Sequence, residues 1–167
     1  MSDRAEIHFH LIGQGPERAK AEALTHELHL TNVTFADWVP LEELPGRAAQ
    51  ADVLLGVFGT TEQSMRTVQN KIYQGLAMAK PVISGDAPAI RSAMQHRQHI
   101  YLIERANPVA LADAILELEA DAALRNFIAE EGHRLFQARF TLESIGRQLQ
   151  AVLSQVIEMK TGKREPG

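Results

Sequence analysis

The chain has 167 residues, of which 45% are hydrophobic, and its formal net charge at pH 7 is −4. This size suits one globular domain whose core needs no metal or disulfide, and the absence of cysteine excludes thiolate sites. The negative net charge argues against nucleic acid or an anionic lipid surface as a partner. No apolar run approaches the ~20 residues of a membrane span, and there is no signal-peptide pattern, so we expect a cytoplasmic protein.

Short apolar segments alternate with helical patterns along most of the chain. The expected strands cover residues 6–12, 32–36, 52–57, 82–84 and 98–103. The third of them, DVLLGV, lacks polar alternation, which indicates that both of its faces are covered. We therefore predict an α/β fold with a Rossmann-like, doubly wound, mostly parallel sheet of about five strands.

Helical periodicity fills the intervals between these strands. The expected helices cover residues 16–30, 41–51, 66–79 and 88–95, followed by three closing helices at 108–121, 122–140 and 141–160. Pro45 and Gly46 should restrict the second helix to residue 46 onward or kink it. The sequence thus predicts one domain over residues 1–160, with residues 161–167 as a disordered tail.

Residues 66–84, reading RTVQNKIYQGLAMAKPVIS, predict a helix that has two different faces. The apolar stripe holds Val68, Ile72, Leu76 and Ala79. The neighbouring polar stripe holds Arg66, Asn70, Lys71 and Gln74. Ligands of open α/β sheets sit outside the carboxyl ends of the strands, where a helix N-terminus can bind phosphate. The segment therefore predicts a nucleotide site.

The loop at residues 13–17 leaves a second kind of nucleotide site open. Gly13 and Gly15 follow a strand and open a helix, and Asp37 ends the next strand at the spacing (~20 residues) of an acidic ribose ligand. However, Arg18 stands where the third glycine of a dinucleotide fingerprint would be, and Pro16 lacks a backbone donor. The loop is either a dinucleotide site or an ordinary turn between strand and helix.

Several motifs read together resemble one enzyme family. They are a strand ending Gly-x-Gly-Pro-Glu, an Asn-Val-x-Phe strand, Val-Pro with Glu-Leu-Pro, Ala-Asp-Val before an apolar strand, and LAMAKPVI at residues 76–83. In this order they resemble the C-terminal, donor-binding domain of the group 1 (family four) GT-B glycosyltransferases, over residues 7–155. The resemblance implies a site for a nucleoside diphosphate sugar, with UDP, GDP or ADP as its nucleotide.

The resemblance assigns the sugar and the ribose to two positions that depart from the family. In the family, glutamates eight residues apart contact the transferred sugar and the nucleotide ribose, and this chain has Arg66 and Gln74 there. Gln74 keeps an acceptor for a ribose hydroxyl. Arg66 instead pairs with phosphate or an acidic sugar, or Glu62 supplies the missing carboxylate.

The diphosphate and the base are assigned to two further segments. The backbone N–H groups of Gln69, Asn70 and Lys71 match the family's diphosphate cradle, and the Lys71 side chain either adds a charge or faces solvent. The segment around Trp38 and Val39 corresponds to the loop that holds the base, where Trp38 either stacks on the base or caps the core.

The resemblance assigns no catalytic residue here and implies neither a metal nor another cofactor. His8 and His10 share one face of their strand, but no third ligand accompanies them, so we predict packed histidines rather than a metal site.

The family's donor domain begins one strand and one helix earlier, with an Arg and a Lys that neutralise the leaving diphosphate, and its enzymes also carry an N-terminal acceptor-binding domain. We therefore expect this chain to be the donor-binding half of a retaining transferase, partial and inactive alone. In a sheet of order 3-2-1-4-5-6, strands 6–12 and 52–57 then either pair directly or leave an edge for another chain, as in a homodimer. A non-catalytic nucleotide-binding or interaction module of the same fold remains the alternative.

Overall fold

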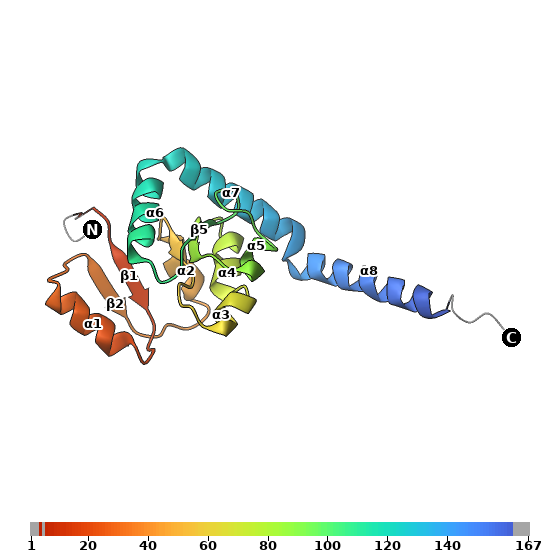
Figure 1. Ribbon diagram of the computed structural model, residues 1–167, viewed down its shortest axis with the longest axis horizontal. Helices are drawn as coiled ribbons and strands as arrows, with labels where there is room; N and C mark the ends of the chain where they lie inside the picture. The colour runs from red at the N-terminus through yellow and green to blue at the C-terminus, as the bar shows by residue number, and fades with distance from the viewer. Residues whose placement is uncertain (1–3, 5, 162–167) are drawn as a thin grey trace. The chain divides into compact units, whose positions relative to one another are not determined.

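The computed structural model describes residue 4 and residues 6–161, which alternate parallel strands with helices and end in three long helices (Figure 1). The chain forms two compact units, Met1–Gln50 and Ala51–Gly167, each described here by itself. The predicted α/β class, the parallel strands and the three closing helices are confirmed. The predicted tail lies outside the described residues, apart from Thr161.

The first unit contains two strands and two helices. These are β1 (Phe9–Ile12), α1 (Arg18–Glu27), β2 (Val33–Ala36) and α2 (Leu44–Ala49). The two strands pair in parallel, with Phe9 opposite Val33. Helix α2 begins before the position that we predicted, because Pro45 falls in its first turn, where a missing backbone N–H costs no helical hydrogen bond.

Arg18 closes the loop that follows β1. Its Nη1 donates to the carbonyl oxygens of Gly13 (2.9 Å) and Ala36 (3.0 Å) and to Asp37 Oδ1 (2.8 Å). Gly13 has φ +139°, which only glycine adopts readily. An arginine at this position therefore ties the ends of β1 and β2 together, and Asp37 already has a cationic partner.

The second unit contains three parallel strands in the order β3-β4-β5. They are β3 (Leu54–Leu55), β4 (Val82–Gly85) and β5 (Tyr101–Ile103). The five strands thus form two sheets rather than one, and direct pairing of strands 6–12 and 52–57 is not found in the part of the chain that the structure describes.

Helices cover both faces of the second sheet. The helices described in this unit are α3 (Glu62–Arg66), α4 (Asn70–Ala77), α5 (Pro88–Arg91), α6 (Pro108–Ala120), α7 (Ala122–Arg139) and α8 (Leu142–Thr161), of which α8 contacts α7. Successive residues of β4 point to opposite faces, so Val82 joins an apolar cluster with Ile72 and Leu76 of α4, whereas Ile83 joins Leu118 of α6. This burial on both sides confirms the doubly wound prediction.

The helix that we predicted at residues 66–79 is two helices in the structure. Thr67 and Gln69 have extended backbone conformations, so α3 ends at Arg66 and α4 begins at Asn70. Helix α4 also ends earlier than predicted, because Ala79 adopts a left-handed turn with φ +51° and is exposed rather than packed. The apolar stripe therefore consists of Ile72 and Leu76 within α4.

Helix α8 carries a row of exposed apolar side chains. They are Leu142, Ile145, Leu149, Val152, Leu153, Val156, Ile157 and Met159. Even so, none of the helices within the described residues is both long and apolar enough to cross a bilayer.

The contact between α4 and β4 requires Gly75. A Cβ at this position would lie 2.4 Å from Val82 Cγ2, so Gly75→Ala should lower the free energy of unfolding by about 1–3 kcal/mol in urea denaturation. The matched control is Gly146→Ala on α8, where a Cβ would meet nothing within 4 Å. We expect this control to raise stability by up to about 1 kcal/mol; equal effects of the two variants would contradict the packing argument.

The ring of His96 accepts a hydrogen bond at Nδ1 from the Leu102 N–H (2.9 Å). Burial, and then the charges of Arg97 and Arg91, lower its pKa below the ordinary 6.5. The folded state thus favours the neutral ring. The stability that His96 contributes is complete above pH 6.5 and declines as the pH falls through 6.5 toward the lower pKa of the folded state. We expect the free energy of unfolding to fall between about pH 7.5 and about pH 5.5.

The variant His96→Asn keeps an acceptor near Nδ1 but does not titrate, so it should flatten this pH dependence. The control His26→Asn, an exposed residue of α1, should leave the slope unchanged. Identical slopes in wild type and His96→Asn would rule out His96 as the source.

Candidate functional site

Ser64, a residue of α3, organises the loop that leads from β3 into this helix. Thr61 caps α3 by accepting from the Ser64 N–H at 3.3 Å. The buried Ser64 hydroxyl donates to the carbonyl oxygens of Gly59 (2.8 Å) and Thr61 (2.7 Å). These contacts hold the loop that leads from β3 into α3.

Gln69 is the N-cap residue of α4, but its side chain does not cap the helix. The side chain turns back instead, and Nε2 donates to the carbonyl oxygens of Ser64 (3.1 Å) and Thr67 (3.0 Å). The first N–H groups of a helix have no acceptor inside it, and in α4 the side chain of the N-cap residue does not supply one. The start of α4 therefore offers the N–H groups of Asn70 and Lys71 to an anion.

One face of α4 is polar and exposed, as predicted for Asn70, Lys71 and Gln74. Asn70 and Gln74 line a cavity of about 310 Å³ together with aromatic and small side chains, namely Tyr73, Ala77 and Phe136. Burial raises the pKa of Tyr73, whose ring packs edge-on against Phe140 at 4.9 Å between centroids. An apolar floor with two amide side chains at its rim suits a ligand that carries hydroxyl groups.

The structure joins Glu62 and Arg66 in an ion pair across one turn of α3. Arg66 Nη2 lies 2.5 Å from Glu62 Oε1, and both side chains are 76% exposed. An exposed i, i+4 pair stabilises a helix by only about 0.3–0.5 kcal/mol, so a ligand can compete for either group. Arg66 lies on α3, so it does not continue the polar stripe of α4 that we predicted.

The residues of the first unit that we predicted to bind the base or to pack as histidines differ in how far they are exposed. Trp38 is 68% exposed, so it does not cap the core of its unit, and Val39 is half-buried. His8 and His10 are also exposed, which makes the prediction of packed histidines wrong; His10 Nδ1 lies 2.6 Å from Thr34 Oγ1. Among the described residues, no three His, Asp or Glu side chains come together as metal ligands.

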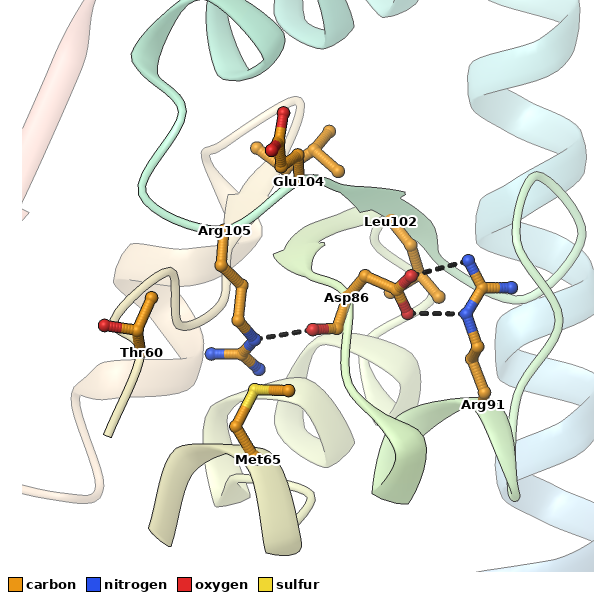
Figure 2. A pocket seen from close by; sticks show the side chains of 8 residues that line it. Thr60, Met65, Asp86, Arg91, Leu102, Glu104 and Arg105 are labelled. Atoms are coloured by element: carbon orange, nitrogen blue, oxygen red, sulfur yellow. Dashed lines mark hydrogen bonds and ion pairs between the residues drawn. The ribbon is translucent and has the colours of Figure 1, made fainter. Parts of the chain in front are cut away.

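A second cavity of about 550 Å³, which we did not predict, lies at the carboxyl ends of β4 and β5 (Figure 2). Its charged residues follow these strands or belong to α5. Arg91 holds both carboxylate oxygens of Asp86, through Nε (2.7 Å) and Nη2 (2.6 Å), and Arg105 donates from Nε to the Asp86 carbonyl oxygen at 2.6 Å. The position of Asp86 and Arg105 just after two parallel strands was the sequence signal for this region.

Residues 1–121 match the sequence profile of the family described as Glycosyl transferases group 1. The chain belongs to this family. LpsD of Rhizobium meliloti (strain 1021), a lipopolysaccharide core biosynthesis glycosyltransferase, is 29% identical over 136 residues, which cover 81% of this chain and 38% of LpsD. The predicted family is thereby confirmed.

Solved structures of glycosyltransferases show the same fold as this group 1 glycosyl transferase chain. Anabaena Alr3699/HepE in complex with UDP superposes with a TM-score of 0.77 at 20% identity, over 90% of this chain and 41% of HepE. Sucrose-phosphate synthase of Thermosynechococcus elongatus gives 0.72 at 22% identity, over 93% of this chain and 40% of that protein. The GT-B Rossmann-like fold is confirmed, and the chain spans about two fifths of the length of these proteins.

Proposed function

We propose that this chain is the donor-binding half of a retaining glycosyltransferase and that it binds a nucleoside diphosphate sugar at the start of α4. The observation that carries the proposal is the uncapped N-terminus of α4 beside an exposed polar face. Family membership supports it, and so does the fold shared with HepE, a protein solved in complex with UDP.

The diphosphate would lie at the N–H groups of Asn70 and Lys71. A helix N-terminus carries the equivalent of roughly +0.5 charge, and hydrogen bonds to a charged group contribute about 1.5–3 kcal/mol each. The Lys71 ammonium adds a mobile positive charge on the same exposed turn. No metal ion is part of the proposal, as the family resemblance implies none.

The ribose and the sugar would contact side chains rather than the backbone. Gln74 can accept from one ribose hydroxyl and donate to another, and it shares the rim of its cavity with Asn70. Glu62 can accept from sugar hydroxyls, whereas the Arg66 guanidinium suits phosphate or an acidic sugar. The assignment of the base to Trp38 and Val39, which rests on the family resemblance, completes the proposed donor site.

Transfer itself would need an acceptor-binding domain or subunit, since the curated relative LpsD has more than twice the matched length. We expect the chain alone to bind donor without measurable transfer. Cytoplasmic location and a homodimer remain predictions of the sequence.

Calorimetric titration with UDP, GDP, ADP and NAD tests the donor site. We expect a nucleoside diphosphate to bind, and Lys71→Ala and Gln74→Ala each to weaken its binding about 5- to 30-fold, because each removes about 1–2 kcal/mol of polar contact. The matched control Lys80→Ala removes the same charge beyond the other end of α4 and should leave the affinity unchanged. Binding of NAD alone, or indifference to both substitutions, would overturn the assignment.

A further inference from the structure

The guanidinium of Arg105 joins three segments that are distant in the sequence, and Figure 2 shows its contact with Asp86. Nε donates to the Asp86 carbonyl oxygen (2.6 Å), Nη1 donates to the Gly59 carbonyl oxygen (2.6 Å), and Nη2 donates to the Ser64 carbonyl oxygen (3.1 Å). These carbonyls belong to the loop after β3, to α3 and to the residue after β4. Arg105 therefore fixes the positions of the loops at the carboxyl edge of the second sheet.

Within the part of the chain that the structure describes, no carboxylate pairs with Arg105. The carboxylate of the neighbouring Asp86 has both oxygens on Arg91, so Arg105 reaches only the backbone of that residue. Burial lowers the pKa of Arg105, which reflects the cost of desolvating its charge. A cation that is held mainly by carbonyl oxygens is suited to positioning backbone, and most of its N–H donors are already used.

The contact with Ser64 leads to the start of α4. The Ser64 carbonyl oxygen accepts from Arg105 Nη2 and from Gln69 Nε2, both at 3.1 Å. Gln69 is the N-cap residue of α4, and its Oε1 is buried without a hydrogen-bond partner, so its amide is oriented through its NH₂ group alone. A shift of Ser64 would therefore remove one of the two backbone carbonyls that hold the side chain of Gln69, the residue just before α4.

We propose that Arg105 is a positioning residue for the donor site, acting through Ser64 and Gln69 on the N–H groups of Asn70 and Lys71. The inference rests on the proposed function, because its purpose is to hold a diphosphate cradle in place. Anion binding by preorganised N–H groups requires that their positions are held to within about 0.5 Å and their directions to within about 10–20°. A relay of shared hydrogen bonds from the loop after β5 supplies that constraint to a helix whose N-cap side chain does not cap it.

The experiment compares Arg105→Met and Arg105→Lys in the full chain. Methionine keeps an apolar stem next to Gly85, where a Cβ would lie 2.6 Å from Arg105 Cγ, but it has no donors. We expect Arg105→Met to weaken UDP binding about tenfold and to shift the amide resonances of Asn70 and Lys71 in the ligand-free protein. Arg105→Lys should lose less affinity, because one ammonium can reach some of the carbonyls but not all. It also serves as the test if Arg105→Met does not fold.

A double-mutant cycle separates positioning from general destabilisation. If Arg105 acts through Gln69, Arg105→Met should have little further effect on UDP affinity in a Gln69→Ala background. The matched control is Arg125→Met, since Arg125 also donates to backbone carbonyls, those of Leu118 (2.6 Å) and Glu119 (3.3 Å), but around the junction of α6 and α7. This control should lower thermal stability without changing UDP affinity.

The outcomes distinguish the inference from the proposed function. If wild type binds none of UDP, GDP and ADP, the donor-site assignment fails, and the ligand-free amide shifts alone decide whether Arg105 orders α4. Unchanged resonances of Asn70 and Lys71 in Arg105→Met would overturn the relay. Equal losses of UDP affinity in Arg105→Met and Arg125→Met, or fully additive effects of Arg105→Met and Gln69→Ala, would also overturn it.

Discussion

The second unit depends on the complete burial of β4. Val82 and Ile83 face opposite apolar clusters, so α4 on one side and α6 on the other are both anchored to the same short strand. Because both faces of this strand are covered, the carbonyls at its end need hydrogen-bond partners from the protein where the chain leaves the sheet. Arg105 does so for the carbonyl that follows β4 and, with the same guanidinium, for two loops beside it.

In the first unit an arginine also hydrogen-bonds the backbone carbonyls at the strand ends. Arg18 reaches the carbonyls at the ends of β1 and β2 and pairs with Asp37. In both units an arginine donates to backbone carbonyls at or after the ends of two parallel strands. The arginine at position 18 thus explains why the third glycine of a dinucleotide fingerprint is absent.

Local sequence signals predicted much of this structure. The three closing helices, expected at residues 108–121, 122–140 and 141–160, lie at Pro108–Ala120, Ala122–Arg139 and Leu142–Thr161. The family could be recognised because its motifs are short and ordered along the chain. The Arg105 contacts could not be found in this way, because their partners lie 19, 41 and 46 residues away and depend on how the strands and loops pack.

Periodicity also missed the break between α3 and α4, and the break has a chemical consequence. Arg66 and Asn70 are four residues apart, so a helical pattern continues in phase across residues 67–69. In one continuous helix, the carbonyls of these residues and of Arg66 would accept the N–H groups of the following turn. Extending the chain at Thr67 and Gln69 instead takes the Arg66 and Thr67 carbonyls out of helical register with the Asn70 and Lys71 N–H groups, whereas the Gln69 carbonyl still accepts from the Ile72 N–H (2.9 Å). The interruption thus turns backbone donors that a longer helix would consume internally into donors that face outward.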